Sequence, residues 1–294
     1  MMPEPRVSLV LVNWNQKDLL RRALLSIRSH AAAISHEVIA VDNASTDGSQ
    51  EMVRTEFPDA ILIAKSDNRG YGQALNSGMR QSRGEFVFLL NNDMVLLPET
   101  MQHLISIRER HPDAGVIGCR FFTDMTCTTV QPSAFRVYPT PWNDLVDRIV
   151  GQRLRRAFPR SEAVRRVTAR WDRTWTAGDR PAEVASVVGA AMMTRREVVE
   201  QELFFDEQFY MFLEETDWCR RVRNRGWKIY HVPGAAIVHV HGGSFSTPEL
   251  RRARDEMYYE SYVKYLRKHE SWLAVGFAHA VHTMSRARQR LARG

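Results

Sequence analysis

Long hydrophobic runs are missing from this sequence of 294 residues. A helix that crosses a bilayer needs ~20 consecutive apolar residues, and no such run occurs, so we expect no membrane-spanning helix. The first apolar stretch, residues 7–12, is too short for the core of a signal peptide and is followed at once by Asn13-Trp14-Asn15. We therefore expect the mature chain to begin near Met1.

Cysteine is also scarce. The three cysteines, Cys119, Cys127 and Cys219, are an odd number and form no Cys-x-x-Cys pair. This pattern argues against a disulfide framework and against a four-ligand zinc site. Reduced thiols are the simplest interpretation, and they predict a cytoplasmic protein.

Acidic residues are sparse in two stretches of a chain whose formal net charge is +7 and whose isoelectric point is about 9.6. Residues 148–173 carry nine arginines and two acids, and residues 286–293 carry four arginines and no acid. A local basic excess suits phosphate-bearing ligands, anionic membranes or nucleic acid. Because the basic residues form no recognised RNA or DNA motif, we expect no nucleic-acid partner.

What the sequence does contain is a regular alternation of strand-like and helix-like segments, within an ordinary globular composition of 44% hydrophobic and 26% charged residues. Apolar runs predict strands at 7–12, 37–41, 60–64 and 85–90, and helical periodicity predicts helices near 19–27, 47–57 and 71–82. Strands that are apolar on both faces indicate an α/β fold with a mostly parallel sheet flanked by helices. Ligands bind such sheets at the carboxyl ends of their strands.

The second half is less regular. A helix to about residue 111 and an apolar segment at 115–122 precede residues 123–183, which lose periodicity and are typical of an insertion. Regular signals return at 184–193, in a helix at 217–225, in short strands at 227–231 and 235–239, and in helices from 249 onward. We divide the chain into a first half, 1–122, an insertion with a second half of the same domain, 123–247, and a C-terminal helical extension, 248–294.

The turn Asn91-Asn92-Asp93 follows a buried strand. One carboxylate with two amides suits a hydrated divalent cation, because Mg²⁺ or Mn²⁺ usually takes one or two carboxylates and lets substrate phosphates complete its shell. The alternative is an ordinary turn, which Asn and Asp favour by bonding to their own backbone.

Two further loops lie at predicted strand ends. Asp42 ends an apolar strand, where its carboxylate needs hydrogen-bond donors. A nucleotide base or ribose could supply them, and so could neighbouring backbone amides. The motif Asn68-Arg69-Gly70-Tyr71-Gly72 lets amides at a helix start approach a phosphate. A dinucleotide fold is excluded, because Leu75 stands where the third glycine of its fingerprint belongs.

Glu214, Glu215 and Asp217 begin the helix predicted at 217–225. The helix dipole and an Asp217–Arg221 pair give a structural explanation. The aromatic segment 204–213 would also desolvate these acids and raise their pKa values, as a general base requires.

Downstream, His239 and His241 share one strand face, which suits metal ligation as well as packing. The following Gly242-Gly243 would suit an esterase loop, but no Gly-x-Ser-x-Gly accompanies it, so a hydrolase is excluded.

Taken in order, these motifs resemble the inverting glycosyltransferase family 2, which has the GT-A fold, and within it the rhamnosyltransferase-like bacterial members. The resemblance runs from Val7 to about Ser246. It is carried by Val12-Asn13-Trp14-Asn15, the segment from Val41 to Ser49, Asn68 to Gly72 with Ala74 and Asn76, Leu90 to Asp93, Gly189-Ala190 with Met192, Glu214 to Asp217, and His239 with Gly242-Gly243-Ser244.

The resemblance implies a role for each matched residue. Asp42 would read the donor base, Asp93 would hold the Mn²⁺ or Mg²⁺ that bridges the diphosphate, and His239 would be a further metal ligand. Glu215 stands at the position of the catalytic base. The remaining residues expected to bind the donor are Asn13, Asn15, Asn68, Arg69, Gly72, Asn76, Asn91 and Asn92. The sequence departs from the family in having Asn for Asp in the metal motif and Glu for Asp at the base, which leaves Asp217 and Glu214 as alternative bases.

The expected activity is transfer, with inversion, of a sugar from a nucleotide-diphosphate donor, dTDP-rhamnose first and a UDP-sugar next. The expected acceptor is a saccharide or a polyprenol-linked saccharide in cell-wall or surface polysaccharide synthesis. A catalytically idle nucleotide-sugar-binding protein is the alternative.

Features on the acceptor side are open to more than one interpretation. The C-terminal segment 272–293 suits peripheral contact with the inner leaflet of the cytoplasmic membrane, and equally a solvated helix or an oligomer contact. Trp142, Trp171 and Trp175 would either stack on a sugar or pack inside the protein.

Overall fold

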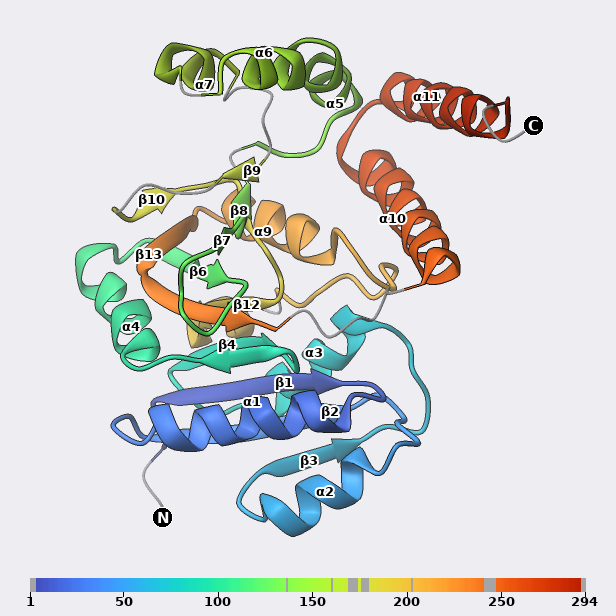
Figure 1. The fold of residues 1–294 in the computed structure, drawn as a ribbon. Helices are drawn as coiled ribbons and strands as arrows, with labels where there is room; N and C mark the ends of the chain where they lie inside the picture. The colour runs from blue at the N-terminus through green and yellow to red at the C-terminus, as the bar shows by residue number, and fades with distance from the viewer. Residues whose placement is uncertain are drawn as a thin grey trace.

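The structure, a computed structural model, describes residues 4–135, 137–159, 161–168, 174–175, 180–201, 203–240 and 247–291 (Figure 1). Its first part is a run of alternating strands and helices, as the periodicity predicts. These are β1 (Val7–Asn13), α1 (Lys17–His30), β2 (His36–Asp42), α2 (Ser49–Glu56), β3 (Ile61–Ala64), α3 (Tyr71–Gln81) and β4 (Phe86–Asn91).

Apart from α4 and β6, the elements that follow are short up to β12. They are β5 (Met94–Leu96), α4 (Thr100–Arg110), β6 (Ala114–Phe122), β7 (Val130–Gln131), β8 (Ala134–Phe135), α5 (Pro141–Val146), the π-helical turn η1 (Asp147–Gly151), α6 (Gln152–Ala157), α7 (Glu162–Thr168), β9 (Thr174–Trp175), β10 (Ala182–Glu183), β11 (Ser186–Val187) and β12 (Ala191–Arg195). The chain ends with α8 (Arg196–Glu200), α9 (Glu214–Asn224), β13 (Lys228–His239), α10 (Pro248–His269) and α11 (Trp272–Leu291).

The main sheet has the strand order β10-β13-β6-β12-β4-β1-β2-β3. β4, β1, β2 and β3 are parallel, whereas β12 runs antiparallel to both β4 and β6. The predicted α/β class with a mostly parallel sheet is therefore confirmed for the first half, and the second half makes the sheet mixed. The carboxyl ends of β1, β2 and β4 lie at one edge, where the sequence predicts the ligand.

Helices cover both faces of this sheet. Alternate residues of β1 explain how: Leu9 and Leu11 pack with α1, α2 and α4, while Val10 and Val12 pack with α3, α8 and α9. All residues of β1 are buried as a result. The sequence pattern, apolar on both faces, therefore predicts the layers correctly.

β13 is one twelve-residue strand, where the sequence predicts two short ones. Its register against β6 shifts between Val232 and Ala236, so the pairing continues past the interruption. Its far end pairs antiparallel with β5, placing His239 opposite Met94. This pairing carries the histidine to the Asn91-Asn92-Asp93 turn.

The predicted insertion at 123–183 holds short helices and the strands β8 and β9, which form a small antiparallel sheet with β11, just beyond the insertion. The C-terminal helices α10 and α11 pack on the segment before α9 through Phe209, Leu213, Tyr265 and Leu266. Figure 1 shows α5, α6, α7 and α11 at the end of the molecule opposite α2. Over the ranges that the structure describes, no helix is both long and apolar enough to cross a membrane.

Candidate active site

Three neighbouring strand ends are joined by a chain of side-chain hydrogen bonds. Asn92, after β4, donates from Nδ2 to Oδ1 of Asn13 at 2.6 Å. Asn13, at the end of β1, donates from Nδ2 to Oδ2 of Asp42, at the end of β2, at 3.1 Å. The structure thus brings together three of the residues predicted to bind the donor, and it does so because the parallel strands end side by side.

Asp42 is 1% exposed, and its carboxylate is firmly oriented. Its Oδ1 accepts from the Ser45 amide at 2.9 Å and from Gln50 Nε2 at 2.8 Å. The sequence left open whether backbone amides or a ligand would satisfy this carboxylate, and the amide contact is present. Gln50, which sequence reasoning did not single out, fixes Asp42 from the first turn of α2. No local pattern separates this glutamine from a solvent-exposed one.

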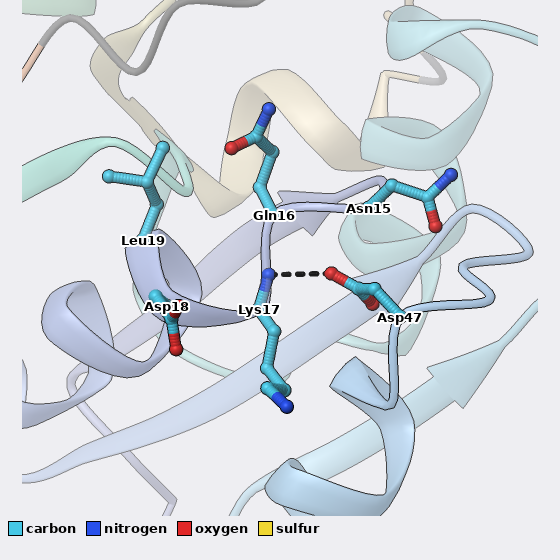
Figure 2. Close-up of a pocket in the computed structure, with 6 residues that line it drawn as sticks. All are labelled: Asn15, Gln16, Lys17, Asp18, Leu19 and Asp47. Atoms are coloured by element: carbon cyan, nitrogen blue, oxygen red, sulfur yellow. Dashed lines mark hydrogen bonds between the residues drawn. The ribbon is translucent and has the colours of Figure 1, made fainter.

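Asn15 joins the loops after β1 and β2. Its backbone is left-handed, with φ of 49°, and its Oδ1 accepts from the Thr46 amide at 2.8 Å. Figure 2 shows Asn15 beside a surface hollow at the start of α1, where the Lys17 amide donates to Asp47 Oδ2 at 2.8 Å. The hollow is lined by Asn15, Gln16, Lys17, Asp18, Leu19 and Asp47. It therefore adjoins the chain of strand-end hydrogen bonds through Asn15.

The Asn68-Arg69-Gly70 loop forms a close contact with the segment before α9. Gly70 has φ of 103°, and a Cβ added to it would lie 2.4 Å from the Tyr210 carbonyl oxygen, so only glycine fits. Asn68 Oδ1 accepts from the Gly70 amide at 3.0 Å and shapes the turn. Arg69 is exposed and pairs with Asp67 at 2.7 Å. Its predicted phosphate contact stays a prediction.

Gly72 and Asn76 of α3 position the segment that leads to α9. A Cβ on Gly72 would lie 3.1 Å from Cβ of Phe205. Asn76 is fully buried, donates from Nδ2 to the Phe205 carbonyl and to Glu207 Oε1, both at 2.9 Å, and accepts from the Phe205 amide. The structure gives both residues a packing role. Direct contact of either residue with the nucleotide-sugar donor stays a prediction.

Asp93 and His239 meet, as expected of two metal ligands. Nε2 of His239 lies 3.1 Å from Oδ2 of Asp93, and the Val240 amide donates to the Asp93 carbonyl at 2.9 Å. The other ring nitrogen, Nδ1, lies 3.1 Å from Oε1 of Gln131. Both ring nitrogens therefore face oxygen atoms. A cation bound between Nε2 and Asp93 Oδ2 would satisfy both of these atoms, while Nδ1 donates to Gln131.

Two buried oxygens beside this pair also suit a cation. Asp93 Oδ1 and Asn91 Oδ1 are inaccessible to solvent and have no hydrogen-bond partner within the described part of the chain. Carboxylate and amide oxygens are ligands that Mg²⁺ and Mn²⁺ accept. No group of three or more His, Cys, Asp or Glu residues gathers here or elsewhere among the described ranges, so diphosphate oxygens and water would have to complete the shell. His241, Gly242, Gly243 and Ser244 lie outside those ranges.

Glu214 and Glu215 begin α9, after a turn in which Phe212 and Leu213 both have left-handed backbone, with φ of 70° and 63°. Glu214 is 4% exposed, and burial, together with the charge of Glu215, raises its pKa well above its ordinary value. Burial therefore disfavours the charged form of Glu214. Glu215 is partly exposed and accepts from the Thr216 hydroxyl at 3.0 Å. Of the two, Glu215 is the one whose side chain reaches solvent.

Tyr71 connects the metal side of the site to the acidic side. Its hydroxyl donates to the Gly189 carbonyl at 3.0 Å, beneath Glu215. Burial raises the pKa of this phenol, and the negative charges of three acids add to the effect, namely Glu214, Asp93 and Glu215. Sequence reasoning treated Tyr71 only as part of a glycine motif. In the structure it is close enough to the predicted metal ligand Asp93 and to two of the three candidate bases, Glu214 and Glu215, for their charges to act on it.

Asp217 has different surroundings from its two acidic neighbours. It is fully buried and lies 2.8 Å from Arg221 Nε, 2.8 Å from Lys268 Nζ and 2.7 Å from His269 Nε2. Burial alone would raise its pKa, but the His269 hydrogen bond and the charge of Arg221 outweigh it and lower the pKa to about 2. The expectation of a raised pKa thus holds for Glu214 and not for Asp217. The Asp217–Arg221 pair is confirmed, and this carboxylate joins α9 to α10.

Of the three tryptophans considered for sugar stacking, only Trp142 has a side chain that the structure describes. Trp142 is exposed and stacks on Phe277 of α11, with ring centroids 4.4 Å apart. Trp171 lies outside the described residues, and only the backbone of Trp175 is described, in β9.

Known proteins resemble this chain in sequence and fold. The family model described as "Glycosyl transferase family 2" matches residues 8–175. The N-acetylglucosaminyl-diphospho-decaprenol L-rhamnosyltransferase of Mycobacterium tuberculosis is 28% identical over 241 residues, which cover 78% of this chain and 74% of that protein. The O-antigen biosynthesis protein RfbC of Myxococcus xanthus is 25% identical over 270 residues, and the match spans 89% of this chain but 19% of that protein.

Two solved structures share the architecture. The mannosyltransferase PcManGT of Pyrobaculum calidifontis, in complex with GDP-Man and Mn²⁺, gives a TM-score of 0.55 at 18% identity and covers 97% of this chain and 76% of its own. Residues 1–349 of TarS from S. aureus give 0.53 at 14% identity and cover 86% and 65%. The expected GT-A fold is confirmed.

Proposed function

The chain belongs to glycosyl transferase family 2, and from this premise we propose that it is a metal-dependent glycosyltransferase that inverts the donor's anomeric centre. The observation that carries the proposal is that the Asp93–His239 pair and Glu215 belong to one site around Tyr71. The charges of Asp93 and Glu215 both act on the buried Tyr71 phenol, and its hydroxyl is bonded to Gly189, which packs against Glu215. A site that cleaves a sugar from a diphosphate needs a cation for the leaving group and a base for the acceptor.

The donor would lie along the strand ends. Asp42, held by Asn13, Ser45 and Gln50, is oriented to accept from the donor's base or ribose. Asp93 and His239, with the amide oxygen of Asn91, would hold Mn²⁺ or Mg²⁺. When bound, the cation would neutralise charge that develops on the departing diphosphate. The Mn²⁺ in the PcManGT complex supports a divalent cation in a protein of this fold.

Glu215 would act as the base. Its carboxylate accepts the proton of the acceptor hydroxyl while that oxygen bonds to the anomeric carbon and the bond to the diphosphate oxygen breaks. Glu214 is less suited to this role, because its carboxyl is buried and burial raises its pKa. Asp217 is less suited because its buried carboxylate is already paired with Arg221, Lys268 and His269, and its pKa is lowered to about 2. One displacement of this kind inverts the anomeric carbon.

We favour dTDP-rhamnose as the donor, a UDP-sugar next, and a polyprenol-linked saccharide as the acceptor. The support is the M. tuberculosis relative, whose name gives an L-rhamnosyltransferase acting on a lipid-linked N-acetylglucosamine. The corresponding role is in cell-wall or surface polysaccharide synthesis, and we place the reaction at the cytoplasmic face of the membrane.

The test compares two adjacent glutamates changed in the same way. Glu215→Gln removes the base and should lower transfer roughly 10²- to 10⁴-fold, with donor binding retained. Glu214→Gln replaces a buried carboxyl by an amide of the same shape and should retain most of the transfer. Transfer would be measured from labelled dTDP-rhamnose and UDP-sugars to an N-acetylglucosaminyl-diphospho-polyprenol, and donor binding by calorimetry.

Two results would change the assignment. Normal transfer by Glu215→Gln would move the base to another residue. Donor binding by the wild type without transfer or donor hydrolysis across the panel would favour a catalytically idle nucleotide-sugar-binding protein.

A further inference from the structure

Two segments far apart in the sequence expose large apolar side chains at the same end of the molecule. One spans α5 to α7 and the other is α11, and Figure 1 shows both at the end opposite α2. We call their exposed surface the distal face. Its apolar members are Trp142, Ile149, Val150, Phe158 and Val167 from the first segment, and Trp272, Leu273 and Met284 from the second. Trp272, at the start of α11, is 80% exposed.

Direct contacts hold the two segments together. The rings of Trp142 in α5 and Phe277 in α11 stack with centroids 4.4 Å apart. The Tyr262 hydroxyl of α10 donates to Asp144 Oδ2 of α5 at 2.9 Å. The distal face is therefore one surface built from both segments, rather than two unrelated hydrophobic patches.

The helices that form this surface are rich in arginine in sequence. Over α5, η1, α6, α7 and α11 the sequence has nine arginines and three acids, and α11 has no Asp or Glu. Arg153 and Arg156 of α6 are exposed. The nearby Asp147 is already paired with Arg155 at 2.8 Å. Few acids are thus left here to pair with the exposed arginines.

The combination of exposed apolar side chains and arginines distinguishes two partners for this face, a second copy of the chain and an anionic membrane. In a symmetric dimer the same patch meets itself, so the arginine-rich surface would face its own positive charge with few acids to pair. An anionic bilayer provides both an apolar environment for the exposed hydrophobic side chains and negative charge for the arginines. Its headgroup region accepts Trp, Leu and Ile side chains, and its phosphates pair with arginine.

We propose that the distal face binds an anionic membrane surface. Its apolar side chains enter the headgroup region, and its arginines contact lipid phosphates. The protein then lies on the bilayer with the acceptor-side helices facing it, which keeps the active site near an acceptor carried on a lipid. Only this last consequence rests on the proposed function.

The test is sedimentation of the full chain with vesicles of phosphatidylcholine alone or mixed with phosphatidylglycerol. The wild type should bind the mixed vesicles and bind those of phosphatidylcholine at least tenfold more weakly. Ile149→Asp with Val150→Asp, and separately Trp272→Asp with Leu273→Asp, should each lower binding at least tenfold. Replacing Arg153 and Arg156 by Gln should lower it roughly fivefold for each arginine, and these exposed changes leave the core intact. Leu25→Asp, at an exposed position on α1, is the matched control and should bind as the wild type does.

Other outcomes would overturn the proposal. These are no binding by the wild type, equal binding to both kinds of vesicle, or unchanged binding in every distal-face variant. A wild-type dimer that these variants dissociate, without vesicle binding, would show that the face joins two copies of the chain. The vesicle assay contains neither sugar donor nor acceptor. The protein can therefore fail to bind vesicles and still transfer sugar to a short water-soluble acceptor, or bind vesicles without transferring sugar.

Discussion

At the scale of single residues, the metal site depends heavily on one side chain. Asp93 supplies the carboxylate of the Asn91-Asn92-Asp93 turn, and its described partner at Oδ2 is His239. Asn91 and Asn92 carry no charge, and Asn92 is already bonded to Asn13. Cation affinity should therefore respond sharply to the charge of Asp93.

Asp93→Asn should abolish most cation-dependent donor binding while the fold persists, because the amide keeps the shape and loses the charge. We expect at least a tenfold loss of affinity for dTDP in the presence of Mn²⁺, measured by calorimetry with and without the metal. Asp255→Asn, at an exposed aspartate of α10, is the control and should have no effect. If Asp93→Asn bound the nucleotide with wild-type affinity and the same metal dependence, Asp93 would be excluded as a ligand.

The sequence predicts a pair of distant residues when a family resemblance links their motifs. The resemblance predicts that Asp93 and His239 act together, and the structure places them in contact. Asp217 was misjudged as a residue with a raised pKa, because Lys268 and His269 approach it from α10, about fifty residues further along the chain. Tyr71 was missed for the same reason, since its neighbours Asp93, Glu214 and Gly189 come from three separate segments.

At the scale of elements, the base is positioned by the contact between the first turn of α9 and the loop before β12. A Cβ added to Gly189 would lie 3.1 Å from Cβ of Glu215 and 3.3 Å from its Cγ. α9 cannot easily move away from position 189, because Asp217 connects it to α10 through Lys268 and His269. A side chain at position 189 would therefore displace the Glu215 carboxylate.

Gly189→Ala should lower kcat roughly tenfold or more, since small misplacements of a catalytic group are costly, and should leave donor affinity unchanged. Steady-state kinetics with a soluble acceptor, together with donor calorimetry, measure the two effects separately. Gly276→Ala is the control, because a Cβ there meets no atom within 4 Å. A wild-type kcat in Gly189→Ala would mean that the contact does not position the base.

Elements built from local periodicity were predicted well, and elements that depend on distant partners were not. β1 to β4 with α1 to α3 follow the predicted order, because each strand or helix shows its own apolar pattern. β5 has three residues and exists because it pairs with β13, more than 140 positions away. The sequence does not predict α5 to α7, since these short helices leave many of their apolar residues exposed and so show weak periodicity.

At the scale of the whole molecule, stability should depend on pH through two buried groups. Burial lowers the pKa of His231 from 6.5 to about 4, and its Nε2 lies 2.8 Å from the Ser133 hydroxyl. The unfolded chain therefore binds a proton between these values that the folded chain does not. Stability from this group is complete above pH 6.5 and is lost as the pH falls toward 4. Asp217, with its pKa lowered from 3.8 to about 2, adds a second loss below pH 4.

The free energy of unfolding should thus fall by about 3 kcal/mol between pH 6.5 and 4 because of His231, and by about 2 kcal/mol more toward pH 2 because of Asp217. Denaturant titrations at a series of pH values measure both steps. His231→Leu cannot take up a proton, so it should flatten the first step even though it lowers stability overall. Asp217→Asn should keep the first step and reduce the second, to which other carboxyls with a lowered pKa, such as Asp47, also contribute. A first step of full size in His231→Leu would assign the acid sensitivity to other buried groups, because the proton uptake that defines the step would then occur without this imidazole.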